Sequence, residues 1–176
     1  VVLHLFCSRE NFTIQLAGNT EGHSRRTQFN ILKNIIVNTP RLRLMIPEKS
    51  ITMSTIENKK RGNLIQAMSG QNTAAAYGDR IGLIWRSDAM ASVDESYFNA
   101  LQAATLDQDQ SFILIDSNVD STDGHVHQLQ LEAQADPAMF ARHVQYDNFE
   151  DFSTSAPTWI NREKAKRLEK VLLPAE

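Results

Sequence analysis

Small polar side chains follow two apolar stretches of the chain, at the point where each stretch ends. Ile81 to Trp85 (IGLIW) runs into Arg86-Ser87-Asp88, and Phe112 to Ile115 (FILI) runs into Asp116-Ser117-Asn118. A carboxylate at the end of a strand can hold a magnesium ion that bridges phosphates, and it can aim a water molecule at them. Asp88 is therefore a candidate metal-binding and catalytic acid, although Ala89 rather than a second acid follows it.

The second strand end offers a different chemistry. In nucleotide hydrolases the strand beside the acid-bearing one often ends in a small polar residue that senses the γ-phosphate, and Ser117 or Asn118 fits that role. Plain Asx or Ser turns explain both strand ends equally well, because these residues often cap or turn the backbone after a strand. A third interpretation is a metal-dependent α/β nuclease that uses Asp88, Asp116 and Asp120.

Several kinds of site are excluded by the sequence. None of the seven glycines is followed by Lys, so the phosphate-binding motif G-x-x-x-x-G-K-S/T is absent from these 176 residues. The nucleophile motif G-x-S-x-G is also absent. The chain has one cysteine, Cys7, so it cannot form an intramolecular disulfide, and a reducing compartment is expected. The apolar run Val1 to Cys7 predicts that this thiol is buried and structural.

Composition predicts one globular domain over residues 1–176. Hydrophobic residues make up 41% and charged residues 22%, and no apolar run approaches the ~18 residues of a membrane span. Eighteen Lys and Arg against 21 Asp and Glu give a net charge of -3. That balance argues against a protein that coats nucleic acid, but it leaves room for a local basic patch.

The spacing of apolar residues predicts alternating strands and helices. Strands are expected at Phe12–Ala17, Leu42–Ile46, Ile51–Ile56, Ile81–Trp85, Phe112–Ile115 and Phe140–Tyr146, with a short apolar stretch at Leu64–Met68. Helices are expected at Ser24–Thr39, Glu95–Thr105, Val126–Ala135 and Asn161–Leu173. Three of the strands (Phe12–Ala17, Ile81–Trp85 and Phe112–Ile115) are short and mostly apolar, which is typical of strands buried on both faces of a parallel sheet in an α/β fold. Their carboxyl ends should meet at one edge of the sheet, where ligands bind in such folds.

In their order along the chain, these features resemble the ATPase domain of the phage large terminase subunit, a DNA-packaging motor, in the part that follows the phosphate-binding loop. The resemblance covers nearly the whole chain and depends on order and spacing. It is carried by Phe12–Thr20, the helix with Gln28, Asn38–Leu42, the hairpin arm Ile51–Ile56, Ser69-Gly70, Gly78, Ile81–Asp88, the helix Tyr97–Ala104, Phe112–Asn118 and Ala156-Pro157-Thr158-Trp159-Ile160.

The resemblance implies a P-loop NTPase-like, mostly parallel sheet flanked by helices, which lacks the Walker A strand and loop. Val1–Cys7 would be the end of the helix that follows that loop. In the preferred register Asp88 occupies the position of the catalytic glutamate of the Walker B motif and Ser87 the metal-side position. In the other register Asp88 itself lies at the metal-side position. Ser117 and Asn118 would couple hydrolysis to motion.

The same resemblance implies Mg²⁺ and ATP as cofactors of the intact protein. It implies double-stranded DNA, a small terminase subunit and a portal as partners, and the cytoplasm of the bacterial host as location. Residues 1–176 would be an incomplete ATPase domain that does not hydrolyse ATP by itself. A sheet that lacks a strand would also expose a pairing edge, which favours self-association. The alternatives are a degenerate prophage-derived module that only binds a partner, and the nuclease described above.

Overall fold

The structure is a computed structural model that describes residues 1–69, 80–89, 95–106, 108, 110–118, 124–142 and 163. Two compact units divide the chain, Val1–Leu129 and Gln130–Glu176. The described helices and strands, in chain order, are α1 (Val2–Ser8), β1 (Thr13–Gly18), α2 (Glu21–Ser24), a π-helical turn (Arg25–Phe29), α3 (Asn30–Asn38), α4 (Pro40–Met45), a 3₁₀ turn (Glu48–Ser50), β2 (Thr55–Asn58), β3 (Asn63–Ser69), β4 (Ile81–Ser87), α5 (Glu95–Ala104), β5 (Phe112–Asp116) and α6 (His125–Ala135).

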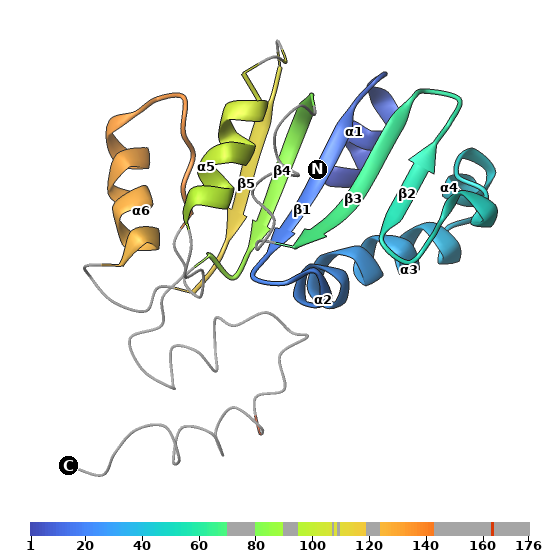
Figure 1. Ribbon diagram of the computed structural model, residues 1–176, viewed down its shortest axis with the longest axis horizontal. Coiled ribbons are helices and arrows are strands. Elements are labelled where there is room, and N and C mark those ends of the chain that lie inside the picture. The colour runs from blue at the N-terminus through green and yellow to red at the C-terminus, as the bar shows by residue number, and fades with distance from the viewer. Residues whose placement is uncertain are drawn as a thin grey trace. The chain divides into compact units, whose positions relative to one another are not determined.

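A five-stranded sheet with the strand order β2-β3-β1-β4-β5 forms the centre of the first unit (Figure 1). β1 lies between β3 and β4 and is parallel to both, and β5 is parallel to β4. Only β2 is antiparallel, and it pairs with β3 at the far edge. The predicted α/β fold with a mostly parallel sheet is therefore confirmed. Parallel strands need crossover connections, and these carry the helices onto the faces of the sheet.

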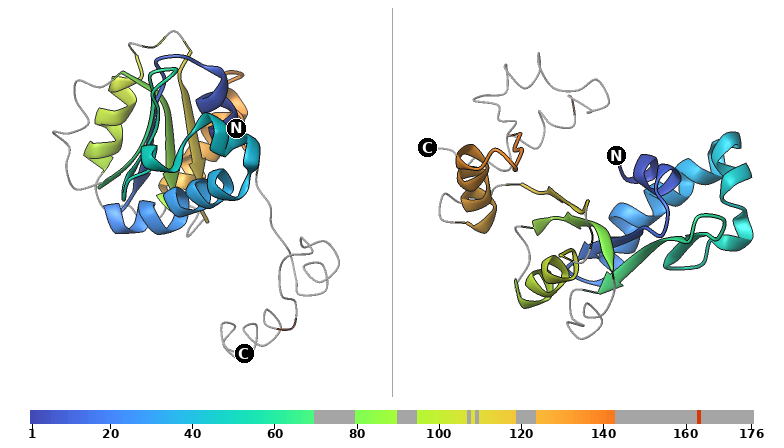
Figure 2. Two further views of the ribbon diagram at one scale, coloured as in Figure 1. Left: turned by 90° about the vertical axis from the view of Figure 1, so that its right-hand side faces the viewer. Right: turned by 90° about the horizontal axis from the view of Figure 1, so that it is seen from above.

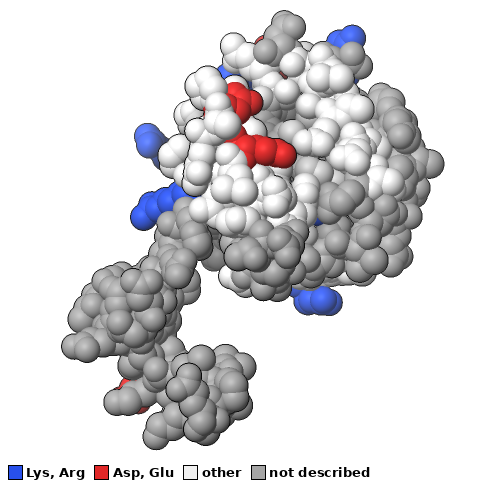
Figure 3. Space-filling model, turned by 90° about the vertical axis from the view of Figure 1, so that its left-hand side faces the viewer, with Lys and Arg blue, Asp and Glu red and all other residues white. Residues whose placement is uncertain are grey.

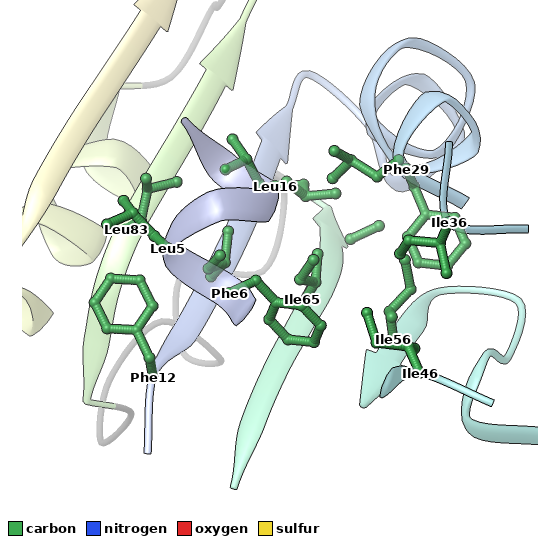
Figure 4. Close-up of a cluster of buried hydrophobic side chains, with 14 residues drawn as sticks. Leu5, Phe6, Phe12, Leu16, Phe29, Ile36, Ile46, Ile56, Ile65 and Leu83 are labelled. Carbon is green, nitrogen blue, oxygen red and sulfur yellow. The ribbon is translucent and has the colours of Figure 1, made fainter. Parts of the chain in front are cut away.

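Helices cover both faces of this sheet. α1 lies on one face and α5 on the opposite face (Figure 2). Side chains of α1 and α3 pack against β1, β3 and β4 in the larger hydrophobic cluster, which includes Phe6, Phe29 and Leu83 (Figure 4). Side chains of α5, such as Leu101, pack against Ile84 of β4 in a second cluster. Burial of these side chains stabilises the layered arrangement by removing apolar surface from water.

Asn63, the first residue of β3, connects the end of α1 with the start of β1. Its side-chain oxygen accepts a hydrogen bond from the Phe12 backbone N–H at 2.8 Å. Its amide nitrogen donates to the carbonyl oxygens of Phe6 and Arg9 at 2.7 and 2.8 Å. The residue is 2% exposed. This one side chain therefore satisfies backbone groups that the end of α1 and the start of β1 leave without a partner.

One predicted strand is wrong. Leu42–Ile46 alternates apolar and basic residues, but Pro40–Met45 is the helix α4. Pro40 occupies the first turn of this helix, where its fixed φ is favourable and its missing N–H is not needed. The alternation did not reflect burial, since Leu44 is 86% exposed.

Other boundaries and burial states also differ from the prediction. The predicted helix Ser24–Thr39 is divided between α2, the π-helical turn and α3. In the predicted hairpin arm Ile51–Ile56, Ile51 forms only an isolated bridge with Ile56, and the regular strand is Thr55–Asn58. The prediction of a buried Cys7 thiol is confirmed only in part, because the residue is half-buried.

Strand β5 was expected to be buried on both faces, and that is wrong. Phe112, Ile113 and Leu114 are 44%, 41% and 36% exposed. The cause is the position of β5 at the edge of the sheet, where only β4 pairs with it among the described strands.

Two elements expected near the C-terminus lie largely outside the described residues. Residues 140–142 of the predicted strand Phe140–Tyr146 are described and are not in a strand. Its other residues, and all but residue 163 of the predicted helix Asn161–Leu173, fall outside the described ranges. Among the described residues, no helix has the length and apolar character needed to cross a membrane.

Candidate functional site

The carboxyl ends of three adjacent strands meet at one edge of the sheet. β1, β4 and β5 are parallel neighbours, so Gly18, Ser87 and Asp116 all lie at the ends of their strands on the same side (Figure 1). The register pairs Ser87 directly with Asp116. The prediction that these polar strand ends converge is confirmed, and the site is built from segments that are far apart in sequence.

Asp88 follows β4 in an unusual backbone conformation. Its φ is +53°, in the left-handed region that most residues avoid and that Asp tolerates better than most. Its backbone N–H donates to the Asp116 carbonyl oxygen at 2.9 Å, which fixes the turn. Positive φ values at non-glycine residues are enriched at functional sites, where the surrounding structure holds the strained conformation. The carboxylate of Asp88 is thus aimed by a fixed backbone turn.

The carboxylate of Asp88 is paired with a histidine from α2, the helix that follows the neighbouring strand β1. His23 Nε2 lies 2.8 Å from Asp88 Oδ2, and the two side chains are 25% and 42% exposed. His23 belongs to α2, a short helix that begins directly after β1. The Thr20 side chain caps that helix by accepting a hydrogen bond from the His23 backbone N–H at 3.1 Å. The end of β1 therefore positions the acid at the end of β4.

Gly18 allows α2 to approach β1 closely. A Cβ atom built on Gly18 would lie 2.9 Å from the Ser24 backbone nitrogen and 3.0 Å from His23 Cδ2. Ser24 itself is buried, and its hydroxyl lies 3.0 Å from the Met68 carbonyl oxygen at the end of β3. The turn after β1 is therefore packed tightly enough to hold the His23 ring in place.

Ser87 and Asp116 form a second polar pair beside Asp88. The Ser87 hydroxyl donates to Asp116 Oδ2 at 2.9 Å, and Ser87 is 7% exposed. The indole N–H of Trp85 donates to the other carboxylate oxygen of Asp116. The π-helical turn adds a further contact, because the fully buried Gln28 donates from its side-chain nitrogen to the Trp85 carbonyl oxygen at 2.7 Å. The end of β4 is thus held by β5 and by the π-helical turn.

Ser117 and Asn118 follow β5 directly. The Ser117 hydroxyl donates to the Asn118 carbonyl oxygen at 3.0 Å. Ser117 is half-buried and Asn118 is exposed. Both residues therefore lie at the same edge of the sheet as Asp88, one strand further along.

The residues at this edge fit a magnesium ion in their donor chemistry. Asp88 and Asp116 offer carboxylate oxygens and Ser87 a hydroxyl, and Mg²⁺ prefers oxygen ligands. Among the described residues, no group of three or more His, Cys, Asp and Glu side chains could hold a metal ion. Mg²⁺ commonly uses one or two carboxylates and completes its coordination with water and substrate phosphates, so this sparse set is compatible with it. Asp120, the third acid of the nuclease interpretation, lies outside the described residues.

Sequence reasoning missed two parts of the site. His23 was not singled out, because nothing in its local sequence connects it with a residue 65 positions later. Asp116 was considered only as a nuclease ligand, although its contact with Ser87 follows from pairing two parallel strands in register. The helix-start signal of Thr20 and Glu21 after β1 was readable and would have placed His23 near the strand end.

Comparison with known proteins gives structural neighbours but no sequence relatives. No known sequence family and no curated protein matches the chain. The large terminase of bacteriophage HK97 superimposes with a TM-score of 0.70 over 96% of this chain at 14% identity, and the match covers 40% of that protein's length. An ATPase-domain mutant of the large terminase of Thermus phage P74-26 matches with a TM-score of 0.60 over 98% of this chain and 76% of that domain, at 9% identity.

A large terminase from a thermophilic bacteriophage, solved in complex with ADP, matches 65% of this chain with a TM-score of 0.50 and 17% identity. At these low identities the likeness establishes the fold and not the chemistry. The chain spans well under half the length of the HK97 protein. Its five-stranded, mostly parallel sheet with helices on both faces is the fold of a phage large terminase ATPase domain.

Proposed function

We propose that this chain is part of a terminase-like DNA-packaging motor ATPase, and that Asp88 works at its Mg²⁺–ATP site. The observation that carries the proposal is the convergence of the β1, β4 and β5 ends, which brings His23, Ser87, Asp88 and Asp116 to one edge of the sheet. In open α/β sheets ligands bind outside the carboxyl ends of the strands. The likeness in fold to terminase ATPase domains, one of them in a protein solved with ADP, supports this assignment.

Each residue has a proposed role at that edge. Asp88 orients the attacking water, and its left-handed backbone turn holds it at the end of β4. Ser87 lies at the metal-side position and offers its hydroxyl oxygen. Ser87 and Asp88 would hold Mg²⁺ together with ATP, and the ion would supply positive charge beside the phosphates. Ser117 and Asn118, at the end of the adjacent strand, respond to the phosphate and transmit its loss to the rest of the motor.

The exposed edge of β5 supports a further strand in the intact protein. Phe112, Ile113 and Leu114 expose apolar surface on both faces of β5. Seen from the left-hand side of Figure 1, the described surface is mostly uncharged, with acidic side chains among the uncharged ones and basic side chains at its rim (Figure 3). In our proposal this edge pairs with the strand that leads into the phosphate-binding loop.

The handedness of crossover connections also supports a further strand beside β5. α5 connects β4 to β5 on one face of the sheet, and parallel crossovers are right-handed in nearly all proteins. A connection that starts beyond β5 and ends at β1 runs in the opposite direction, so it must use the opposite face. α1, which leads into β1, lies on that face (Figure 2). In our proposal α1 is the end of this crossover helix.

We further propose that residues 1–176 do not hydrolyse ATP by themselves, because they lack the G-x-x-x-x-G-K-S/T loop. The intact protein would act on double-stranded DNA with a small terminase subunit and a portal, in the cytoplasm of the bacterial host. A degenerate, prophage-derived binding or scaffold module is the second candidate, since Ser87 stands where the preferred register puts an acid. A gene sequence that encodes a Gly-rich loop with Lys upstream of Val1 would favour the motor, and its absence would favour the module.

Isothermal titration calorimetry of Mg²⁺–ATP into the 176-residue chain tests the incomplete site, with Asp88→Ala as the comparison. We expect no binding and no steady ATP turnover by contaminant-free protein. Binding that Asp88→Ala abolishes would mean that a nucleotide site exists without a phosphate loop, and the proposed incompleteness would be wrong. Binding that Asp88→Ala leaves unchanged would remove Asp88 from the nucleotide site.

A further inference from the structure

Asp116, the last residue of β5, bonds to the end of β4 in three ways. Its Oδ2 accepts from the Ser87 hydroxyl at 2.9 Å, and its Oδ1 accepts from the Trp85 indole N–H. Its carbonyl oxygen accepts from the Asp88 backbone N–H at 2.9 Å. One residue of β5 therefore fixes both the side chain and the backbone at the end of β4.

The contact with Ser87 affects the chemistry that the serine can perform. A serine hydroxyl is neutral, so it cannot replace the negative charge of a carboxylate beside a divalent cation. Here the hydroxyl donates a hydrogen bond to the Asp116 carboxylate, so the lone pairs of the serine oxygen point away from Asp116. The negative charge of the acceptor also increases the electron density on the serine oxygen. Ser87 is 7% exposed and Asp116 is exposed, so solvent reaches the carboxylate while little of it reaches the hydroxyl.

We propose that Asp116 is a positioning residue of the strand-end site, and that it supplies, from β5 and through Ser87, the second carboxylate that the end of β4 lacks. This inference rests on the proposed function, in which Asp88 works beside a magnesium ion. The acidic pair is divided between two adjacent strands, with Asp88 on β4 and Asp116 opposite Ser87 in the register of β5. Asp116 acts on the cation through the hydroxyl that it orients.

A purely structural role for Asp116 predicts different behaviour. A residue that only joins β5 to β4 must bond to the Trp85 indole N–H and to the Ser87 hydroxyl. An Asn side chain can make both bonds, because its oxygen accepts from the indole and its NH₂ group can donate to the serine oxygen. A positioning carboxylate needs its charge and both of its oxygens. Asp116→Asn therefore separates the two roles, since it preserves the shape and removes the charge.

The test uses Mn²⁺ alone as a paramagnetic probe of the ¹⁵N-labelled 176-residue chain. The Asp88 backbone amide and the Trp85 indole N–H report proximity of the ion through line broadening in NMR spectra. We expect both signals to broaden in the wild type, and we expect Asp116→Asn to need about tenfold more Mn²⁺ for equal broadening, the size of effect usual for residues that orient metal ligands. Asp136→Asn, at an exposed acid whose side chain accepts from Ala138 N–H, is the matched control and should behave like the wild type.

A swap variant tests whether the carboxylate can lie on either strand. Ser87→Asp/Asp116→Ser moves the carboxylate to β4 and the hydroxyl to β5, and we expect it to recover Mn²⁺ broadening to within about threefold of the wild type, as ligand-orienting contacts are restored. Thermal unfolding of every variant checks folding, and the swap remains informative if Asp116→Asn unfolds. Equal broadening in the wild type and in Asp116→Asn would overturn the role of Asp116 alone. No broadening in the wild type would overturn the metal role of Asp88, and this inference with it.

Discussion

His23 Nε2 and Asp88 Oδ2 lie 2.8 Å apart, although the two residues are 65 positions apart in sequence. The contact joins the turn after β1 to the turn after β4, the strand that lies beside it. Both side chains remain partly exposed, so the pair is reachable by solvent and by a ligand. The acid at the proposed magnesium site therefore already has a partner within the chain, and a cation must compete with that partner for the carboxylate.

Replacement of His23 should release Asp88. We expect His23→Ala to strengthen Mn²⁺ binding by about twofold to fivefold, because a partly exposed ion pair contributes at most about 1 kcal/mol. Unfolding should be little affected for the same reason. The measurement is Mn²⁺-induced broadening of the Asp88 amide signal. His4→Ala, at an exposed histidine on α1, is the control; weaker Mn²⁺ binding by His23→Ala would contradict the competition and make His23 a supporting ligand.

Gly18 should tolerate no side chain. A Cβ at this position would lie 2.9 Å from the Ser24 backbone nitrogen, which cannot move without shifting α2. We expect Gly18→Ala to lower the free energy of unfolding by about 1 to 3 kcal/mol, the usual cost of overpacking. Urea denaturation measures the loss. Gly22→Ala should be neutral or slightly stabilising, because a Cβ there would meet only flexible side chains outside its own helix backbone, the nearest being Arg26 Nη1 at 3.7 Å. Equal losses at both glycines would contradict the steric explanation.

The sheet could be predicted from the sequence because β1 and β4 are mostly apolar and end at polar turns. That pattern is typical of strands buried on both faces, and both strands have helices on each side of the sheet. The convergence of the strand ends followed from the parallel arrangement alone. The position of Asp88 directly after the end of β4 could therefore be predicted from the sequence.

Local sequence patterns led to wrong predictions where contacts with a neighbouring strand or helix determine the secondary structure or the burial of a segment. The FILI sequence of β5 reads as a buried strand, and its exposure depends on its place at the edge of the sheet. The alternation in Leu42–Ile46 resembles a strand, but Pro40 starts a helix there, and no residue of that helix is buried. The contacts of His23 and Asp116 depend on which strands are adjacent and on their register, and neither is encoded near the residue itself.

The buried side chain of Asn63 should be essential to the fold. Asn63→Leu removes three hydrogen bonds and leaves the Phe12 N–H and the Phe6 and Arg9 carbonyls without that partner. We expect a loss of about 2 to 4 kcal/mol in the free energy of unfolding, because unsatisfied buried polar groups carry most of this cost. Urea denaturation provides the measurement. Asn38→Ala is the control, since its exposed side chain bonds only to Asn34 of its own helix; a loss at Asn63 no larger than at Asn38 would contradict the prediction.

The single cysteine should react slowly with thiol reagents. Burial raises the pKa of the Cys7 thiol above its ordinary value, and the positive charge of Arg61 partly opposes this effect. The thiolate is the reactive form, so a raised pKa lowers its fraction at pH 8. We expect labelling by a chromogenic disulfide to be slower than for the unfolded chain, and slower still in Arg61→Gln, whose side chain is uncharged. Lys60→Gln, at the exposed residue beside it, should label at the wild-type rate, and faster labelling of Arg61→Gln would contradict the electrostatic effect.

The open edge of β5 should make the chain self-associate as its concentration rises. An edge strand with exposed apolar side chains offers unpaired backbone groups to another chain, and charged side chains on an edge suppress such pairing. Sedimentation velocity of the wild type should therefore detect dimers or larger species, which Leu114→Lys returns to monomer. Leu44→Lys places the same charge on α4, at a residue that is 86% exposed, and should leave the association unchanged. A wild type that stays monomeric at every concentration, or an equal effect of the two lysines, would mean that β5 is not the associating edge, and the support that this edge gives to a missing strand would be lost.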